Sequence, residues 1–366
     1  MKNKNMISEL LKTVNGGVYR ILFLVITVTV AENLNAQSVD VVVRDNGVER
    51  QESIDLPKSM TYPIDSLLND WKAKTYLQLG KDCNTSEENP YFSDSIYVDR
   101  LSRIPSVMEM PYNDVVRKFI DMYASRLREQ VSFMLSASNF YIPIFEEALD
   151  AYNLPLELKY LPVIESALNP SAVSRAGASG LWQFMIGTGK IYGLEVNSLV
   201  DERRDPIKAT WAAARYLKDL YEIYQDWNLV IAAYNCGPGN INKAIRRSGG
   251  KNDYWSIYNL LPKETRGYVP AFIAANYLMT YYCDHNICPM ETDIPANTDT
   301  VQVTKALHFE QIADICGISM EQIKSLNPQY RKNIIPGNIE PYTLRLPYNQ
   351  VSTFIDSQDT IYKHRA

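Results

Sequence analysis

The sequence predicts a mainly α-helical domain that is followed by a small α+β module. Between residues 112 and 282, apolar residues recur at the spacing of amphipathic helices, and Pro, Asn and Asp stand where helices begin or end. Strand-type alternation is scarce before residue 295. Beyond that point the predicted order is strand, helix, helix and strand, which is typical of a compact module.

The helices are predicted from apolar spacing and from the residues that cap them. The first begins at Asn113, a candidate N-cap, because apolar residues then follow at Val116, Phe119, Ile120, Tyr123 and Leu127. Another begins at Asp205, an N-cap that precedes Pro206 at the first helical position. The helices expected after the first span residues 140–151, 155–168, 206–224, 227–234, 240–247 and 266–282, and a further helix is expected to begin near Leu181.

The C-terminal module is predicted from a change in composition after Pro289. Residues 290–300 are rich in Asp, Thr, Pro and Asn and are interpreted as a linker. The module, residues 301–348, contains a strand at 301–304, helices at 309–316 and 319–326, and a strand at 342–347. We expect residues 349–366 to be a C-terminal tail.

The N-terminal residues have the features of an export signal. Basic residues precede an uninterrupted apolar run at residues 21–31, which is too short for a comfortable membrane span. Cleavage is expected after Ala36, with Ala31 as another candidate, and an uncleaved anchor is the alternative. We therefore expect residues 1–36 to be a signal peptide, and the protein to be exported to the periplasm or cell envelope, with outer-membrane association as one alternative. Residues 37–110 are polar and interrupted by Pro, so they are interpreted as a linker or a loosely structured lead-in with short local elements.

Composition and cysteine usage exclude some classes of function. The 366 residues are 46% hydrophobic and carry a net charge of −5, which favours a sizeable core and argues against nucleic acid as a partner. The 25 tyrosines suit either a sugar-binding surface or the rim of a core. Cys283 and Cys288 are close enough to form a disulfide, although unpaired thiols are an equal alternative. No metal site is expected, because His285 is the only histidine near them.

Glu165 is the candidate catalytic residue because of its position on a predicted helix. Leu154, Leu158, Leu161 and Leu168 share one apolar stripe, and Glu165 falls on the same stripe. A carboxyl group that leaves water has a raised pKa, which keeps it protonated near neutral pH. That is the property of a general acid, although a hydrogen-bonded structural Glu or one at the rim would show the same spacing.

Four segments follow one another in order around this residue. They are LPVIESALNPSAVS around Glu165, GASGLWQFM at residues 177–185, AAYNCGPGNI at 232–241 and LPKETRGYVP at 261–270, with DERRDP at 201–206 between the second and third. In this order and spacing they resemble the lytic transglycosylase family of the lysozyme-like superfamily, glycoside hydrolase family 23. The resemblance covers about residues 112–285 and implies a lysozyme-like helical catalytic domain at residues 111–289.

The resemblance implies a role for each residue of these segments. Glu165 is the sole catalytic carboxylate, and Gly177 and Gly180 let the backbone approach the sugar. Trp182 is interpreted either as a stacking residue or as core. Cys236 replaces the usual second Ala of the third segment without touching the implied site. Glu264 contacts substrate or, alternatively, is a helix-start carboxylate near Arg266. The substrate-binding residues implied are Ser166, Ser174, Gly180, Gln183, Met185, Tyr234, Asn235, Glu264 and Tyr268.

The resemblance also implies the reaction. Glu165 protonates the oxygen between N-acetylmuramic acid and N-acetylglucosamine in peptidoglycan, and then removes a proton from the muramoyl C6 hydroxyl, which closes on C1 to a 1,6-anhydromuramoyl end. No cofactor or metal takes part, the partner is the glycan strand, and we expect a monomer. The alternatives are a lysozyme-type hydrolase with the same acid and a non-catalytic peptidoglycan-binding protein.

The C-terminal module resembles a LysM module, a small peptidoglycan- or chitin-binding domain. The stretch that carries the resemblance is FEQIADICGISMEQIKSLNPQYRKNIIPGNIEPYTLRLP. The usual Gly-Asp-Thr-Leu opening is missing, and KALHFEQI stands there instead. Glycan binding and a purely structural role are therefore both open for this module, and His308 within it is interpreted as a surface or packing residue.

Overall fold

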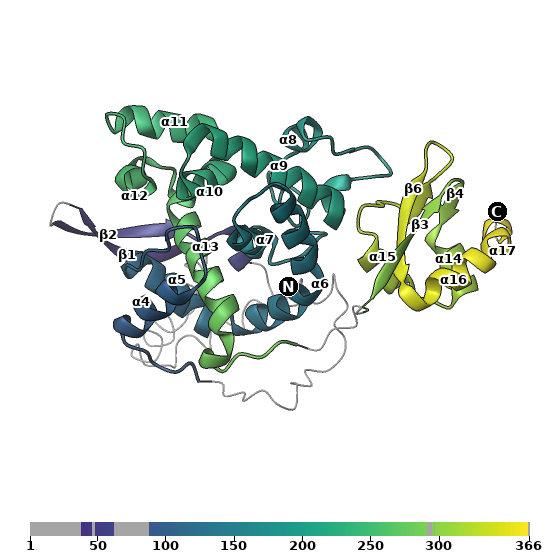
Figure 1. Ribbon diagram of the computed structural model, residues 1–366, viewed down its shortest axis with the longest axis horizontal. Helices are drawn as coiled ribbons and strands as arrows, with labels where there is room; N and C mark the ends of the chain where they lie inside the picture. Colours follow the sequence, from purple (N-terminus) through teal and green to yellow (C-terminus); the bar gives the residue numbers. More distant parts are fainter. Residues whose placement is uncertain (1–37, 46–47, 62–87, 291–294, 296, 365–366) are drawn as a thin grey trace, which may run out of the picture.

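The chain folds into a helical domain with a smaller α+β module beside it (Figure 1). The two parts have separate hydrophobic cores. The prediction of a mainly helical domain followed by an α+β module is therefore confirmed. The predicted signal peptide, residues 1–36, lies outside the described residues. This computed structural model describes residues 38–45, 48–61, 88–290, 295 and 297–364.

The helical domain contains α-helices and short 3-10 helices. Its α-helices are α4 (Asp94–Arg103), α5 (Asp114–Ser125), α6 (Arg128–Ala151), α7 (Leu161–Ser166), α8 (Ile186–Ile191), α9 (Pro206–Tyr224), α10 (Trp227–Cys236), α11 (Pro238–Arg247), α12 (Tyr254–Ile257) and α13 (Lys263–Tyr281). Its 3-10 helices are η1 (Lys58–Thr61), η2 (Leu156–Tyr160), η3 (Glu202–Arg204), η4 (Tyr258–Leu260) and η5 (Tyr282–His285).

Two of the helices begin at the residues that the sequence predicts as caps. The Asn113 side chain accepts hydrogen bonds from the backbone N–H groups of the second and third residues of α5. Asp205 does the same at the start of α9, where Pro206 takes the first helical position. Both helix starts are set by hydrogen bonds within three residues, and such local chemistry can be read directly from sequence.

The predicted helix over residues 155–168 is wrong in its continuity. It is divided into η2 and α7, because Pro162 has no N–H to donate to the preceding turn. Helix α7 ends at Ser166, and Ala167 and Leu168 follow with positive φ angles of 51° and 60°. The short helix α7 lies near the middle of the domain, and α13 packs against it as well as against α5 and α10 (Figure 1).

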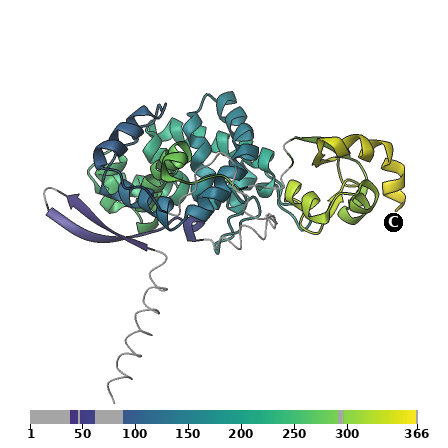
Figure 2. The ribbon, with the colours of Figure 1, turned by 90° about the horizontal axis from the view of Figure 1, so that it is seen from below.

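The N-terminal lead-in is more ordered than predicted. Strand β1 (Ser38–Asp45) pairs antiparallel with β2 (Val48–Asp55), and this hairpin packs on α5 and α13 (Figure 2). Val41 and Ile54 are fully buried in the domain core. Residues 38–45 and 48–61 form ordered versions of the short local elements expected in this lead-in, and Val39, Val41 and Val43 recur at every second position, as in a strand with one buried face. The outer boundaries of the predicted domains stay predictions.

Gly267 on α13 has no side chain, and this allows the hairpin to pack closely against the helix. A Cβ atom at this position would lie 2.7 Å from Ile54 Cγ2 and 2.8 Å from the Asp55 carbonyl oxygen. We expect Gly267→Ala to lower the free energy of unfolding by about 1–3 kcal/mol, because the hairpin must shift. Urea unfolding measures this loss. Gly239→Ala in α11 is the control, since no atom lies within 4 Å of its Cβ position. An equal effect of the two changes would contradict close packing of the hairpin.

The C-terminal module is built from two short strand pairs and four helices among the described residues. Strand β3 (Thr298–Val303) pairs antiparallel with β6 (Tyr342–Pro347), and β4 (Ala306–His308) with β5 (Ile334–Pro336). Its helices are α14 (Phe309–Cys316), α15 (Met320–Leu326), α16 (Tyr348–Asp356) and α17 (Gln358–Lys363). The predicted C-terminal tail is wrong, because Phe354 and Ile361 of the last two helices are buried in the module core.

The cysteines do not pair as the sequence allowed. Cys288 is disulfide-bonded, whereas Cys283 is a free thiol, so a Cys283–Cys288 disulfide is wrong. Cys236 and Cys316 are also free, in agreement with the alternative of unpaired thiols. Among the described helices, none combines the length and the apolar character that crossing a membrane requires.

Candidate active site

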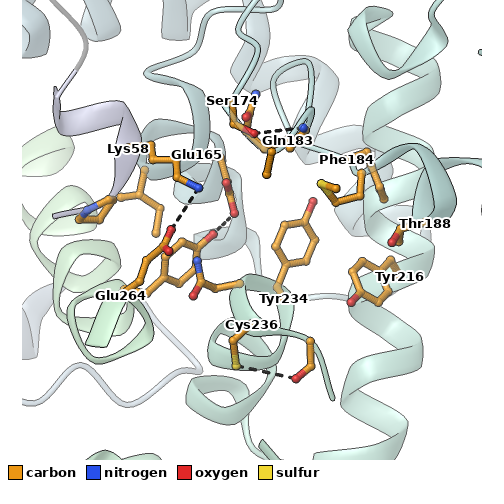
Figure 3. A pocket seen from close by; sticks show the side chains of 18 residues that line it. Lys58, Glu165, Ser174, Gln183, Phe184, Thr188, Tyr216, Tyr234, Cys236 and Glu264 are labelled. Carbon is orange, nitrogen blue, oxygen red and sulfur yellow. Dashed lines mark hydrogen bonds and ion pairs between the residues drawn. The ribbon is translucent and has the colours of Figure 1, made fainter. Parts of the chain in front are cut away.

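A pocket of about 370 Å³ opens between the segments that the sequence motifs identify (Figure 3). It lies between α7, the loop before α8, the end of α10 and the start of α13, and 3-10 helix η1 borders it. Its lining residues are Pro57, Lys58, Ile164, Glu165, Ser174, Ala176, Ala178, Gln183, Phe184, Met185, Thr188, Tyr216, Tyr234, Asn235, Cys236, Gly237, Glu264 and Tyr268. The pocket therefore unites all four motif segments, which are far apart in the chain.

Glu165 lies in the last turn of α7 and points into this pocket (Figure 3). Its side chain is partly buried, between fully buried neighbours of the helix. Burial raises the pKa of the Glu165 carboxyl to about 7, and the nearby Glu264 adds to the increase. A hydrogen bond from Tyr268 and the charge of Lys58 act in the opposite direction. The balance leaves a carboxyl that is protonated in a good part of the molecules near neutral pH, as a general acid requires.

Two tyrosines approach Glu165 from different helices. Tyr268 on α13 is almost fully buried, and its hydroxyl donates a hydrogen bond to Glu165 Oε1. Tyr234 on α10 donates to the Trp182 carbonyl oxygen at 2.7 Å, and the charge of Glu165 raises the pKa of Tyr234 beyond what burial does. Both hydroxyls stay protonated, so they act as hydrogen-bond donors at this site.

The loop before α8 contributes polar groups to the part of the pocket wall that lies across from Glu165. Gln183 has a positive φ of 47°, and its Nε2 donates to the carbonyl oxygens of Gly180 at 2.8 Å and Ala172 at 3.2 Å. Ser174 Oγ accepts from the Ala178 N–H at 3.0 Å. Met185 precedes α8 and is about half exposed. These contacts hold the loop in one shape while Ser174, Gln183 and Met185 face the pocket.

Two of the predicted substrate-binding residues do not line the pocket. Ser166 is fully buried, and its hydroxyl donates to the carbonyl oxygens of Pro162 and Leu181, at 3.1 Å and 2.9 Å. Gly180 is also buried, and a Cβ atom there would run into the carbonyl group of Arg203. In the structure they join the loop to α7 and to η3, and their predicted contact with substrate stays a prediction.

Trp182 belongs to the core, as one of its two interpretations expects. The ring is fully buried, lies edge-on to Phe145 at 5.2 Å between centroids, and its Nε1 donates to Thr210 Oγ1 at 2.9 Å. A stacking role on substrate is therefore wrong, because no face of the indole reaches the pocket.

The wall of the pocket toward α13 contains an ion pair that the sequence did not predict. Lys58 of η1 pairs with Glu264 at 3.5 Å, and Pro57 beside it also lines the pocket. Arg266, the partner that the alternative assigned to Glu264, binds Glu52 of the hairpin instead. Asn235 accepts from Thr265 Oγ1 at 2.8 Å. Nothing local in the sequence marks Lys58 as a site residue, because the packing of η1 against α7 brings it there.

The hydrogen bond between Tyr268 and Glu165 predicts a shift in the pH dependence of the reaction. Removing it by Tyr268→Phe takes away an interaction that favours the charged carboxylate, so the pKa of Glu165 rises. If Glu165 must be protonated in the free enzyme, the alkaline limb of kcat/KM moves to higher pH. Rates measured from pH 5 to 9 check this. Tyr216→Phe, a change in the same pocket without contact to Glu165, should leave the limb in place. If the alkaline limb of Tyr268→Phe is unchanged or moves to lower pH, this would contradict the assignment of Glu165 as the acid that Tyr268 contacts.

The pocket has no set of metal ligands in the described part of the chain. There, no group of three or more His, Cys, Asp or Glu side chains is placed to hold a metal ion. Cys236 does line the pocket, and burial raises the pKa of its thiol, so it is predominantly the neutral thiol at neutral pH. The groups available for acid–base chemistry at the pocket are therefore the carboxyls of Glu165 and Glu264.

Comparison with known families identifies the class of this site. Residues 143–257 match the family described as Transglycosylase SLT domain. Residues 297–363 match the family described as Lytic transglycosylase MltD, LysM-like domain. Two stretches of the chain thus match the models of a transglycosylase SLT domain and of a LysM-like domain of the MltD type, and the family resemblance read from the sequence is confirmed.

Particular relatives agree with this class. The chain is 32% identical over 224 residues to the membrane-bound lytic murein transglycosylase D of Escherichia coli (strain K12), which covers 60% of this chain and 49% of that protein. It is 33% identical over 124 residues to the soluble lytic murein transglycosylase of the same strain, covering 32% of this chain and 19% of that protein. The chain thus spans about half the length of the first of these relatives. The solved 70 kDa soluble lytic transglycosylase from Escherichia coli has 28% identity and a TM-score of 0.35, covering 42% of this chain and 26% of that one.

Proposed function

We propose that this protein is a peptidoglycan lytic transglycosylase that cleaves the β-1,4 bond between N-acetylmuramic acid and N-acetylglucosamine without consuming water. The observation that carries the proposal is Glu165, a carboxyl with a pKa of about 7 that faces a pocket in an SLT domain. The names of two relatives, both lytic murein transglycosylases, support the same reaction. A non-catalytic binding protein would have no need of an acid with this pKa.

In the first step Glu165 donates its proton to the glycosidic oxygen. Bond cleavage leaves positive charge at C1 of the muramoyl residue, and the N-acetyl group of the same sugar stabilises it. Tyr268 donates to the Glu165 carboxylate that forms, and this hydrogen bond strengthens as negative charge develops on Glu165. The substrate is held by the pocket residues Ser174, Gln183, Met185, Tyr234, Asn235 and Glu264.

In the second step the Glu165 carboxylate removes the proton of the C6 hydroxyl. The C6 oxygen then bonds to C1, the charge at C1 is neutralised, and Glu165 is protonated again for the next cycle. Atoms balance without water, so the products are a 1,6-anhydromuramoyl end and a new N-acetylglucosamine end. A pKa near 7 suits both halves of the cycle, because one group must first donate and then accept a proton.

Mass analysis of digested peptidoglycan tests the proposal. The expected products are anhydromuropeptides, 18 mass units lighter than their hydrated forms because one water is missing. Reaction in water labelled with ¹⁸O gives no label in these ends. Labelled reducing ends would show a lysozyme-type hydrolase that uses the same acid, with Glu264 as a candidate second carboxylate in the pocket. Binding of peptidoglycan with no cleavage would favour the non-catalytic alternative.

The cellular setting belongs to the proposal as well. An enzyme of this kind acts on the glycan strands outside the cytoplasm, so the protein is proposed to be exported to the periplasm or cell envelope. The printed name of one relative describes it as membrane-bound. Membrane association and a monomeric state are proposed for this chain on that likeness and on the expected signal peptide. N-terminal sequencing of the mature protein and sedimentation in detergent-free buffer test these two points.

A further inference from the structure

The segment between α8 and α9 joins the C-terminal module to the helical domain. Val200 of this segment is buried and belongs to the hydrophobic core of the module, not to that of its own domain. Leu199 beside it packs against the same core. The module is therefore not only tethered through the chain at residues 290–300, because part of the helical domain completes its core.

Backbone hydrogen bonds fasten the same segment to the module. Val200 forms an antiparallel bridge with Tyr330, the Asp201 N–H donates to the Gln329 carbonyl at 2.8 Å, and the Arg331 N–H donates to the Leu199 carbonyl at 2.8 Å. A side-chain contact adds to them, since Tyr342 of β6 donates to Glu195 Oε2 at 2.8 Å. In Figure 1 this segment is the connection that reaches from α8 toward the module.

Asp201 links the module to the helical domain through hydrogen bonds to arginines of both parts. Its side chain is fully buried and accepts hydrogen bonds from Arg203 Nε and Nη2, both at 2.8 Å, and from Arg331 Nη2 at 2.5 Å. Burial raises the pKa of the Asp201 carboxyl, but the two guanidinium groups outweigh burial and hold it below its usual range. The carboxylate is therefore shared between Arg203 of its own domain and Arg331 of the module, and Arg204 Nε of its own domain lies 4.0 Å from Asp201 Oδ2.

Arg203 connects this carboxylate to the pocket loop. Its Nη1 donates to the carbonyl oxygens of Gly177 at 2.8 Å and Phe184 at 2.9 Å. The same residue presents its backbone carbonyl to the open side of Gly180. These three positions lie within the loop of residues 174–185, from which Ser174, Gln183 and Met185 face the pocket. The orientation of one buried guanidinium group thus fixes both ends of that loop.

We propose that Arg331 is a positioning residue, through which the C-terminal module holds the pocket loop of residues 174–185 in its working shape. Asp201 is buried, Arg203 must also satisfy two carbonyl groups, and Arg204 lies farther away, at 4.0 Å, so the hydrogen bond from Arg331 holds the carboxylate in one orientation. The module therefore supports the active site through a fixed contact. This role is separate from any binding of glycan by the module. Its function at the pocket requires no contact between the module and the substrate.

Hydrogen exchange on the full chain tests this directly. Arg331→Met removes the charge, and we expect the amides of Ser179, Gly180 and Gln183 to exchange about tenfold faster, with α10 and α13 unchanged. Lys332→Met is the control, because it removes an equal charge from the next residue, whose side chain is exposed. Arg331→Lys keeps the charge but not the planar fork, so an intermediate exchange rate is expected, and this variant also serves if Arg331→Met does not fold.

A kinetic measurement adds a readout that exchange does not give. We expect Arg331→Met to lower kcat/KM about tenfold, with Lys332→Met at the wild-type value, because a loop displaced by a fraction of an ångström misplaces the sugar. The kinetic measurement rests on the proposed function, whereas the hydrogen-exchange measurement does not. Unchanged exchange at residues 174–185 in Arg331→Met, while Asp201 and Arg331 amides exchange faster, would overturn the proposal. An inactive wild-type protein with the expected exchange pattern would overturn the proposed function and leave the positioning role standing.

Discussion

Glu165→Gln is expected to slow glycan cleavage by roughly 10²- to 10⁴-fold, the range that loss of a general acid produces. The amide has nearly the same shape as the carboxyl and can still accept the hydrogen bond from Tyr268, but it has no proton to donate to a glycosidic oxygen. Release of anhydromuropeptides, measured by mass spectrometry at matched enzyme concentrations, gives the rate. Glu264→Gln in the same pocket is the comparison, because that carboxyl is paired with Lys58 and is not the proposed acid. A Glu165→Gln enzyme with near wild-type rate would contradict the assignment.

The same substitution has a predicted effect on stability that is independent of substrate. The folded-state pKa of Glu165 is about 7, above the ordinary value of 4.5 for an unfolded Glu. Between these two values the folded chain keeps a proton that the unfolded chain has lost, so the free energy of unfolding falls as pH rises from about 4.5 to 7 and then levels. Glu165→Gln should remove this contribution to the slope. Urea unfolding at pH 4.5, 6 and 8 checks it, and parallel pH curves for the two proteins would show that Glu165 is not desolvated.

Gly180→Ala is expected to be the most destabilising single change in the pocket loop. A Cβ atom would collide with the carbonyl group of Arg203, and the positive φ of 85° is itself unfavourable for Ala. We expect a loss of about 1–2 kcal/mol from the left-handed backbone and a further loss of about 1–3 kcal/mol from displaced packing. Since η3 and the loop separate, glycan cleavage should fall with stability. Urea unfolding and product release on the same preparations measure both effects.

Gly177→Ala is the matched control for that change. Gly177 also has a φ of 85°, but no atom lies within 4 Å of its Cβ position. We expect the free energy of unfolding to fall by only about 1–2 kcal/mol, the cost of the left-handed backbone for Ala. The packing of η3 against the loop stays intact. If the two variants lost equal stability, the close approach of Arg203 to Gly180 would not contribute to holding the loop.

Residues whose role depends on near neighbours in the chain could be predicted well. Asn113 and Asp205 cap their helices as expected, because a cap binds backbone N–H groups two and three residues ahead. Glu165 was placed on the buried side of its helix by apolar spacing, and it faces the pocket although the helix is broken at Pro162. The error in the helix did not change this outcome, because Leu158, Leu161 and Leu168 of the predicted stripe are still buried.

Residues whose role depends on distant partners could not be predicted in this way. Ser166 and Gly180 lie in the right motifs, yet they support the loop rather than the pocket, because Leu181 and Arg203 occupy the space beside them. Lys58 reaches the pocket from η1, which lies in a segment interpreted from the sequence as a linker or a loosely structured lead-in. The disulfide of Cys288 was missed for the same reason, as spacing along the chain does not encode separation in space.

The order of helices and the α+β module were predicted from local sequence pattern, and the predictions of an export signal and of Glu165 as the acid rest on local pattern and motif as well. The pKa of Glu165, the ion pair that faces it and the docking of the module through Arg331 and Asp201 exist only after folding. The physical reason is that desolvation and ion pairing depend on which side chains surround a group in three dimensions. Caps and amphipathic faces, in contrast, need only the neighbours that the chain itself supplies.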